Sequence, residues 1–452
     1  MKKNGYDLII VGAGGAGLTA AVQASELGMR VVVLEKNAKV GGNTSRASSG
    51  MNAAETSVQA QHGIVDHMRS FYDETLQGGG RLNDPAMLRH FVTHAPLAID
   101  WLAQHGLPLT DLTITGGMTK QRTHRPASTA PVGAYLVKGL HQLAVDAGVT
   151  IITEADVTKL LVTNNRINGV QYCDDHGQLQ ELNAGAVVLT TGGFGASKEL
   201  MQRYRPDLTH YRTTNQDGAT GDGLKLAHAV GAQLMQLDLV QVHPTVQQDQ
   251  AHTYLIGEAV RGEGAILVNQ DGQRFVNELA TRRIVSNAIT GLPENSAYLI
   301  FDQQVRERVK AIEFYNQIGL VKSAETLADL ASQLDLAQLP LTIDQWNHAV
   351  EGQHDREYGR TTGMDHPLKQ APFYAIHVAP AIHYTMGGIH VDTATRVYDA
   401  NGQTIPGLYA AGEVVGGLHG NNRIGGNSIA ETVVFGRQAA MTAKEDLQKW
   451  IK

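Results

Sequence analysis

The sequence lacks the features on which several classes of protein depend. Cys173 is the one cysteine among 452 residues, which excludes an internal disulfide framework, a cysteine-ligated iron–sulfur cluster and a C-x-x-C-H haem site within this chain. No apolar run reaches the length of a spanning helix, so we expect no membrane span. The net charge of −7 provides no basic footprint for nucleic acid. Because the apolar N-terminal stretch leads straight into a glycine motif without a cleavage region, we expect a cytoplasmic protein.

Glycine, in contrast, is abundant, with 49 residues, and its first cluster has an informative spacing. Residues 6–11 (YDLIIV) predict a short buried strand, and residues 12–17 (GAGGAG) hold the pattern G-x-G-x-x-G. A helical pattern then runs to Gly28, and residues 30–35 predict a second buried strand that ends in Glu35. This order of strand, glycine turn, helix, strand and acid predicts a dinucleotide-binding unit.

Each part of this pattern has a physical reason. Gly12 permits the tight turn, Gly14 lets the backbone approach a pyrophosphate, and Gly17 lets the helix pack closely on the strand. The helix N-terminus offers free N–H groups and a positive dipole end. Glu35 can accept hydrogen bonds from a ribose diol. The polar, glycine-rich segment 39–52 could wrap the rest of a larger dinucleotide, which favours FAD over NAD without deciding between them.

The rest of the chain changes its pattern at two places. Residues 149–190 predict a β-meander, because Asn-Asn and Asn-Gly pairs separate its apolar runs. From 238 to 382 the pattern differs, with a helix-rich stretch at 283–350, and this part of the chain indicates an inserted domain. Residues 383–452 return to the order of strand, glycine turn and helix.

Polar residues that are suited to chemistry gather in three places. They are His243; Glu258 and Arg261, followed by Arg282 and Arg283; and His383, followed by Arg423. A guanidinium fork binds a carboxylate through two hydrogen bonds, so separated cationic clusters suggest a small dicarboxylate, or a carboxylate with a second polar group. The same residues also allow surface ion pairs and core histidines. No zinc-like ligand spacing or GxSxG motif is present, so we expect no metal.

At these residues the sequence resembles the soluble flavoprotein subunits of the fumarate reductase/succinate dehydrogenase family, most of all the flavocytochrome-type fumarate reductases without their haem domain. The motifs cover nearly the whole chain and include TTGGFG, HPT, EAVRGEGAILVNQDGQRFVNE, HYTMGGI and PGLYAAGEVVGGLHGNNRIGGNSI. The resemblance implies an α/β fold with a Rossmann-like FAD-binding domain and a β-meander, at 1–237 and 383–452. An inserted α+β clamp (capping) domain at 238–382 would split it.

The resemblance also implies a reaction, the reduction of fumarate to succinate with hydride from flavin N5. His383 and Arg423 match residues that bind and polarise one substrate carboxylate. His243 matches a residue that holds the other end. The positive charge would stabilise the charge that develops on the carboxylate once hydride adds to the alkene.

The same resemblance implies how the proton arrives. Arg282 matches the proton donor, and its neighbour Arg283 is the alternative assignment. Glu258 and Arg261 match the proton relay. Because free guanidinium hardly ever gives up its proton, this role follows from the resemblance alone.

For the cofactor, the resemblance implies FAD. The family's covalent flavin histidine would fall within 48–52, where no histidine stands, so we expect non-covalent binding. The expected cofactor contacts are Gly12, Ala13, Gly14, Gly15, Ala16, Gly17, Glu35, Lys36, Gly41, Gly42, Asn43, Thr44, Gly50, Met51, Asn52, Val157, Thr191, Gly192, Gly193, Asp222, Tyr384, Gly412, Glu413, Arg423, Gly426, Asn427, Ser428 and Ile429.

One substrate position departs from the family pattern. The fumarate reductases usually carry threonine just before the relay glutamate, and this chain carries Gly257. The substrate could therefore be another 2-enoate, of the urocanate, acrylate or hydroxycinnamate type, or the enzyme could resemble an L-aspartate oxidase. We expect a monomer that takes electrons from an external donor, namely reduced flavin, a flavoprotein or an NADH-linked reductase.

Overall fold

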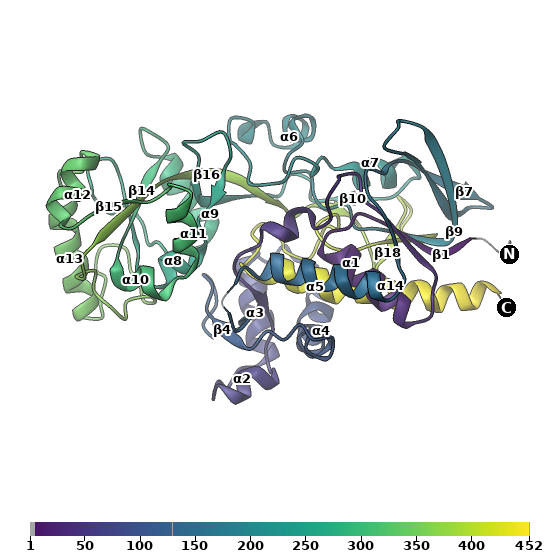
Figure 1. Cartoon of the computed structure of the whole chain (residues 1–452), viewed down its shortest axis with the longest axis horizontal. Coiled ribbons are helices and arrows are strands. Elements are labelled where there is room, and N and C mark those ends of the chain that lie inside the picture. The colour runs from purple at the N-terminus through teal and green to yellow at the C-terminus, as the bar shows by residue number, and fades with distance from the viewer. Residues whose placement is uncertain (1–4, 129, 452) are drawn as a thin grey trace.

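The computed structural model describes residues 5–128 and 130–451, which form two lobes joined by a long strand (Figure 1). The larger lobe contains a twisted sheet in the order β18-β19-β9-β1-β2-β6, in which every pairing is parallel except that of β18 with β19. The strands are β1 (Tyr6–Val11), β2 (Val31–Leu34), β6 (Thr150–Ile152), β9 (Leu179–Leu189), β18 (Arg396–Tyr398) and β19 (Thr404–Ala410).

Helix α1 (Gly15–Glu26) packs against α5 (Val132–Asp146) and α14 (Asn427–Ile451), and the three lie together beside this sheet (Figure 1). Helices from both ends of the chain thus cover the same strands. The strand–turn–helix–strand order predicted for residues 6–35 is confirmed. The strands are apolar without alternation because a parallel sheet is covered on both faces.

The predicted meander is present but shorter than expected. It consists of β7 (Asp156–Thr163), β8 (Arg166–Cys173) and β9, which pair antiparallel in turn. Residues 150–152, which the sequence placed in the meander, instead form β6 and pair with β2 at the edge of the parallel sheet. Glu154 lies between them with φ +55°, and this left-handed residue turns the chain from one sheet into the other.

Short elements complete this lobe. They are α2 (Ser57–Gln61), α3 (Met68–Gly78), α4 (Pro85–Gln104), α6 (Lys198–Tyr204), α7 (Asp222–Ala229), the 3₁₀ turns η1 (Gly42–Arg46) and η2 (Pro206–Leu208), and the strands β3 (Met51–Asn52), β4 (Asp111–Thr113), β5 (Thr123–Arg125), β10 (Leu234–Met235) and β17 (Gly388–Ile389).

The smaller lobe contains an antiparallel sheet in the order β12-β11-β16-β14-β13, with β15 also paired to β16. Its strands are β11 (Val240–Gln247), β12 (Tyr254–Leu255), β13 (Ile266–Val268), β14 (Ala297–Asp302), β15 (Lys322–Ala324) and β16 (Phe373–Thr385). Its helices are α8 (Glu258–Gly262), α9 (Arg282–Thr290), α10 (Gln303–Arg308), α11 (Ala311–Gln317), α12 (Leu327–Leu334) and α13 (Leu339–Glu351).

The sequence missed an interior strand of this lobe. The stretch 283–350 is rich in helix, but it also holds β14, a run of six residues between β13 and β16. A short apolar run without alternation fits a buried strand and a buried helix equally well, so periodicity could not separate the two.

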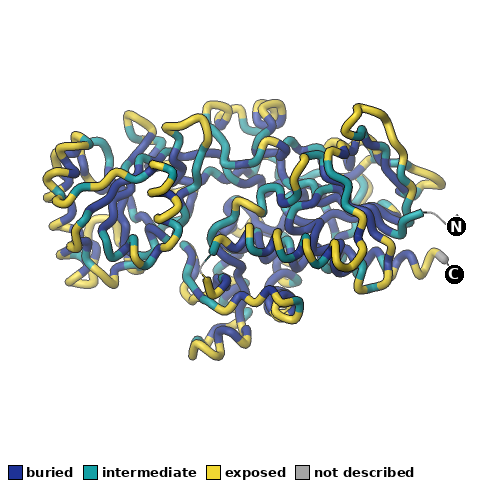
Figure 2. The backbone as a smooth tube through the Cα atoms, viewed as in Figure 1, coloured by how far each residue is buried: buried dark blue, intermediate teal, exposed yellow. Residues whose placement is uncertain are grey.

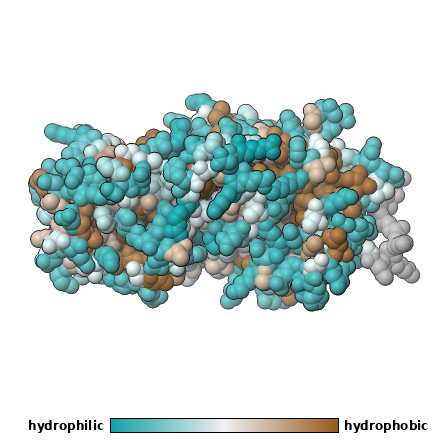
Figure 3. Space-filling model, turned by 90° about the horizontal axis from the view of Figure 1, so that it is seen from above, coloured by the Kyte–Doolittle hydropathy of each residue, from teal (hydrophilic) through white to brown (hydrophobic). Residues whose placement is uncertain are grey.

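Two hydrophobic cores follow the two lobes, and the buried backbone runs through both (Figure 2). The core of the smaller lobe draws its residues from Ile256 to Val378. The division at 237/238 and 382/383 stays a prediction, and β16 crosses its second boundary. Seen from above, the surface is mainly hydrophilic, with hydrophobic side chains in separate areas (Figure 3).

Candidate active site

One cavity of about 650 Å³ extends from the glycine turn of the larger lobe to side chains of the smaller lobe. Gly14, Gly15 and Ala16 at the start of α1 line one part of it, and Glu258 and Arg282 line another. A single cavity therefore joins the predicted dinucleotide site to the predicted substrate residues.

Gly12 and Gly17 of the glycine turn have no room for a side chain. Gly12 has φ +105°, and a Cβ atom there would lie 2.5 Å from the Thr190 carbonyl oxygen. A Cβ atom on Gly17 would lie 1.9 Å from the Gly12 carbonyl oxygen. The N-cap residue of α1 is Gly14, and the first helical N–H, that of Gly15, donates to Thr44 Oγ1 at 3.0 Å. Gly15 and Ala16 at the start of this helix line the cavity, so the positive dipole end of α1 faces it, as a pyrophosphate site requires.

Glu35 lies directly after β2 and lines the cavity. The backbone N–H of Ala13 donates to its Oε2 at 2.9 Å, and the backbone N–H of Asn37 donates to its Oε1 at 3.0 Å. These contacts hold the carboxylate in place, where its remaining lone pairs can accept from a ribose diol.

Most of the expected cofactor contacts line the cavity, but nine do not. These nine are Ala13, Gly17, Gly41, Gly50, Met51, Asn52, Gly193, Gly426 and Asn427. Asn52 illustrates the reason, since its Nδ2 donates to the Gly425 carbonyl oxygen at 2.7 Å and its Oδ1 accepts from Thr123 Oγ1 at 2.6 Å. Such a residue fixes one segment of the cavity wall to another.

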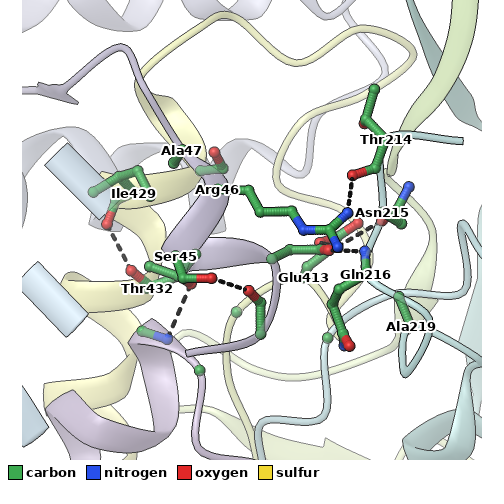
Figure 4. A pocket seen from close by; sticks show the side chains of 18 of the residues that line it. Ser45, Arg46, Ala47, Thr214, Asn215, Gln216, Ala219, Glu413, Ile429 and Thr432 are labelled. Atoms are coloured by element: carbon green, nitrogen blue, oxygen red, sulfur yellow. Dashed lines mark hydrogen bonds between the residues drawn. The ribbon is translucent and has the colours of Figure 1, made fainter. Parts of the chain in front are cut away.

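Several lining residues have no counterpart among the sequence predictions. Arg46 extends across the view in Figure 4 and donates from Nη1 to the Thr214 carbonyl oxygen at 2.9 Å. Asn215 and Gln216 line the same region, and Asn215 Oδ1 accepts from Asn43 Nδ2 at 2.6 Å. Of these three residues, only Arg46 could have been found from the sequence, because it lies in the polar segment 39–52. No motif distinguishes Asn215 or Gln216.

The structure brings six expected substrate residues to this one cavity. His243 lies on β11, Gly257 and Glu258 lie at the start of α8, Arg282 begins α9, His383 lies on β16, and Arg423 precedes α14. Arg261 does not line the cavity but lies buried behind Glu258. Arg282 is buried whereas Arg283 is exposed, so the geometry favours Arg282 of the two adjacent arginines.

Among the described residues, Glu258 is the one carboxylate in contact with Arg282. Arg282 donates from Nε to Glu258 Oε1 at 2.5 Å and from Nη1 to Gln241 Oε1 at 3.1 Å. Nη2 of Arg261 lies 3.8 Å from the same carboxylate oxygen. Burial alone would raise the pKa of Glu258, but the charges of Arg282 and Arg261 outweigh burial and hold this pKa below its usual value.

His243 and His383 are both neutral at pH 7. Burial, and then the charge of Arg282, lowers the pKa of His243 and that of His383 well below 6.5. The backbone N–H of Thr245 donates to His243 Nδ1 at 3.3 Å, which places the ring proton on Nε2. This buried Nε2 has no partner among the described residues, so it can donate to a ligand oxygen.

Arg423 adds a third buried cation. Its guanidinium carbon lies 4.6 Å from the centre of the Tyr384 ring, and its Nε has no partner in the described part of the chain. Burial and the charge of Arg282 lower the pKa of Arg423 to about 10. The phenol of Tyr384 donates to Glu431 Oε2 at 2.6 Å, which fixes the ring beneath the guanidinium.

The residues present fit FAD. At Gly12, Gly15 and Gly17 the glycine turn leaves no room for a Cβ atom, and the buried Thr191 Oγ1 in the cavity wall has no partner among residues 5–128 and 130–451. Glu35 lies beside this turn with free lone pairs. An adenine dinucleotide offers the anionic pyrophosphate and the hydroxyls that these groups would bind.

Comparisons with known proteins agree with this assignment. The model of the FAD binding domain family matches residues 7–429. The chain is 46% identical over 97% of its length to an NADH:fumarate oxidoreductase of Klebsiella pneumoniae, but it spans only 47% of that protein. It is 38% identical to a fumarate reductase (cytochrome) of Shewanella frigidimarina, covering 98% of this chain and 78% of that one. The solved open conformation of a flavocytochrome c3 fumarate reductase superposes with a TM-score of 0.83 at 37% identity, over 98% of this chain and 79% of that one.

The fold and the cavity define an FAD-dependent oxidoreductase with a second, capping lobe. The chain belongs to the fumarate reductase family of FAD-binding flavoproteins. FAD is therefore its cofactor, as the family resemblance implies. None of the helices that the described residues form is long and apolar enough to cross a membrane.

Proposed function

We propose that this protein reduces a carbon–carbon double bond next to a carboxylate, with fumarate as the first substrate to test. The observation that carries the proposal is the charge of the substrate end of the cavity. Among the described residues, the buried guanidinium groups of Arg261 and Arg282 share the carboxylate of Glu258 as their ion-pair partner, and Arg423, also buried, has no carboxylate within 4 Å. This surplus of guanidinium groups suits a dicarboxylate.

Arg423 and the two histidines bind the substrate in this proposal. The unpartnered Nε of Arg423 and Nε2 of His243 can each donate to a carboxylate oxygen. His383 is held by Thr214, whose Oγ1 lies 2.7 Å from its Nδ1, and its ring lies 5.2 Å from that of His243. Because both rings are neutral, they donate without adding charge to a site that already contains three guanidinium groups.

The bound FAD supplies the hydride. Arg423 stabilises the negative charge that then develops on the substrate carboxylate, and its effect is large because the site is buried. Arg282 gives a proton to the neighbouring carbon. Glu258 holds Arg282 through the 2.5 Å contact at Nε, which leaves Nη2 outside that ion pair. The alkene thus gains one hydride and one proton.

Anaerobic turnover tests this proposal. The FAD-loaded protein is mixed with reduced methyl viologen and fumarate, and oxidation of the viologen is followed together with succinate formation. We expect turnover by the wild type, whereas Arg283→Met serves as the matched control for Arg282→Met. L-Aspartate with oxygen is the parallel assay, and peroxide formed there without any enoate reduction would contradict the proposal.

A second substrate class is favoured by the space at Gly257. The N–H of Gly257 donates to the buried Tyr315 hydroxyl at 3.1 Å, and a Cβ atom on Gly257 would lie 3.4 Å from Ser48 Oγ. Tyr254 and Phe314 line the same region of the cavity. The missing side chain at Gly257 and these aromatic lining residues favour a larger 2-enoate, such as urocanate or a hydroxycinnamate.

Gly257→Thr distinguishes the two classes. The site accepts a Cβ atom at ordinary contact distances, and a threonine hydroxyl would narrow the space. We expect the ratio of kcat/KM for fumarate to that for urocanate or a hydroxycinnamate to rise about tenfold, since one pocket group changes discrimination by about 1–3 kcal/mol. An unchanged ratio would show that Gly257 does not select the substrate.

We also propose that FAD is bound without a covalent link and that electrons come from an external donor. Residues 48–52 contain no histidine that could attach the flavin. Acid precipitation should release all flavin into the supernatant. Electron transfer from reduced free flavin, from a flavoprotein or from an NADH-linked reductase can be compared in the same turnover assay, and sedimentation tests the proposed monomer.

A further inference from the structure

A tyrosine of the smaller lobe presents its hydroxyl to the large cavity. Tyr315 lies on α11 and is 4% exposed, and its side chain belongs to the hydrophobic core of that lobe. Tyr315 and Gly257 both line the cavity, and the backbone N–H of Gly257 donates to the Tyr315 hydroxyl at 3.1 Å. Because the core holds the ring and the hydroxyl lies beside Gly257, the hydroxyl is the part of Tyr315 that faces the cavity.

This hydroxyl has a proton to donate. Its oxygen accepts from Gly257, and its O–H donates to no acceptor among the described residues. Burial raises the pKa of Tyr315, so the phenol stays protonated at neutral pH. A buried donor without an acceptor costs free energy, so its retention indicates that a ligand supplies the acceptor.

The hydroxyl borders the space that a side chain at residue 257 would fill. A Cβ atom on Gly257 would lie 3.4 Å from Ser48 Oγ and 3.6 Å from the Tyr315 hydroxyl oxygen. Ser48 belongs to the larger lobe and Tyr315 to the smaller one, and both line the cavity. Hydroxyls from both lobes therefore make this end of the cavity polar, although Tyr254 and Phe314 line the same region.

A second uncharged donor lies on the same side of the cavity. The N–H of Ile256 donates to the Thr245 carbonyl oxygen at 2.9 Å, and the N–H of Thr245 donates to His243 Nδ1 at 3.3 Å. These bonds connect the residue before Gly257 to the imidazole whose Nε2 has no partner among the described residues. Arg423 comes from the larger lobe, so a substrate held by Arg423 at one end meets these donors of the smaller lobe at its other end.

We propose that Tyr315 determines substrate specificity by donating a hydrogen bond to a second acceptor group, at the end of the substrate that Arg423 does not bind. This inference rests on the proposed function, because it names what a 2-enoate must carry besides its reactive carboxylate. The second carboxylate of fumarate, a ring nitrogen of urocanate and the phenol of a hydroxycinnamate are such acceptors, whereas acrylate has none. An enoate without a second acceptor leaves the buried phenol unpaired, and the site discriminates against it.

Removing one oxygen atom tests the inference. Tyr315→Phe keeps the ring and deletes the donor. Tyr298→Phe is the matched control, because Tyr298 lies on β14 of the same lobe and does not line the cavity. The measurements are the dissociation constants of succinate and butyrate, followed by the flavin absorbance of the FAD-loaded protein, and kcat and KM with fumarate. Butyrate carries a methyl group where succinate carries its second carboxylate.

We expect Tyr315→Phe to weaken succinate binding about tenfold to a hundredfold, because a hydrogen bond to a charged group is lost. Butyrate binding should stay close to that of the wild type, and KM for fumarate should rise by a larger factor than kcat falls. Tyr298→Phe should match the wild type in every measurement. Unchanged succinate affinity in Tyr315→Phe, or equal weakening of succinate and butyrate, would overturn the inference.

A rescue variant separates the loss of the donor from a shift of α8. Gly257 has φ −59° and ψ 150°, which serine adopts freely, so Gly257→Ser in the Tyr315→Phe background returns a hydroxyl to the same space. Recovery of succinate affinity would support the inference, and no recovery would contradict it. The binding measurements need no turnover, so failure of the wild type to reduce any enoate would refute the proposed function, whereas succinate and butyrate still decide the role of Tyr315.

Discussion

Two clusters of buried charge lie near each other, and they differ in their balance of positive and negative groups. In the clamp-core cluster, Arg274 and Arg360 face Glu278 and Asp355, so positive and negative charges are equal. In the site cluster, which consists of Arg261, Arg282, Arg423 and Glu258, the carboxylate of Glu258 is the one ion-pair partner of Arg261 and Arg282, and Arg423 has no carboxylate within 4 Å among the described residues. Both clusters are buried, so burial does not distinguish a structural group of charges from one that binds a ligand.

The balance of partners does distinguish them. Glu278 accepts from Arg274 at 2.8 Å and from Arg360 at 3.1 Å, and two further contacts at 3.0 and 3.2 Å join Arg274 to Asp355. The site cluster instead leaves nitrogens of Arg261 and Arg423, and Oε2 of Glu258, without partners in the described part of the chain. A buried charge without a partner costs free energy, so its retention indicates a ligand.

The largest expected effect is on catalysis in the site cluster. Arg282→Met keeps much of the side-chain volume but removes the proton donor, so we expect kcat with fumarate to fall about 10²–10⁴-fold. The exposed neighbour provides the control, since Arg283→Met should retain wild-type kcat. Equal activity of the two variants would remove Arg282 from the mechanism.

The second effect is on stability in the clamp-core cluster. Glu278→Gln leaves Arg274 and Arg360 with too little negative charge, so we expect the free energy of unfolding to fall by about 3–5 kcal/mol in urea titrations. Glu313→Gln breaks the more exposed pair with Arg306 and should cost at most about 1 kcal/mol. Similar losses in both variants would contradict the contrast between buried and exposed pairs.

The third effect is again on the free energy of unfolding, but in the site cluster we expect it to have the opposite sign. Arg423→Met removes a buried charge that has a like charge beside it, so the ligand-free protein should gain about 1 kcal/mol in the free energy of unfolding. Malonate should stabilise the wild type but not this variant. Thermal unfolding with and without malonate measures both quantities, and a loss of stability without ligand would show that Arg423 is a structural residue.

The smallest effect is on the pH dependence of stability. The pKa of His243 is lowered in the folded state, so the unfolded chain binds a proton first and the stability that neutral His243 contributes is lost as the pH falls below about 6.5. In His243→Gln, stability should therefore fall less steeply on acidification, by up to about 1.4 kcal/mol per pH unit. Identical pH profiles of unfolding for wild type and variant would contradict a neutral buried histidine.

The dinucleotide half of the site was predictable because its signals are local. Gly12, Gly14 and Gly17 lie within one turn, and the unbroken apolar runs on either side predict buried strands. The strand β14 was missed because a run of five apolar residues followed by Asp302 fits either kind of element. The sequence also joined β6 to the meander, since no local signal shows which sheet a short strand will enter.

The choice between Arg282 and Arg283 shows the same limit at the active site. Adjacent residues of a helix point about 100° apart, and the packing of α9 against β11 turns Arg282 inward and leaves Arg283 exposed. The nine cofactor residues that lie outside the cavity are a similar case. A motif indicates that a residue is needed, but it does not show whether that residue contacts the cofactor or supports the wall of the cavity.

The sequence by itself determined the nucleotide-binding unit, the family and the residue types available for chemistry, because these follow from short-range spacing and from matched motifs. Only the tertiary structure decided which charges meet. Arg261, Arg282, Arg423 and Glu258 come from three separate parts of the chain, and their unequal numbers of positive and negative charges become visible once the fold has buried them together. Burial strengthens the interactions between charges, so an unbalanced cluster costs free energy. That balance depends on which residues are neighbours in space.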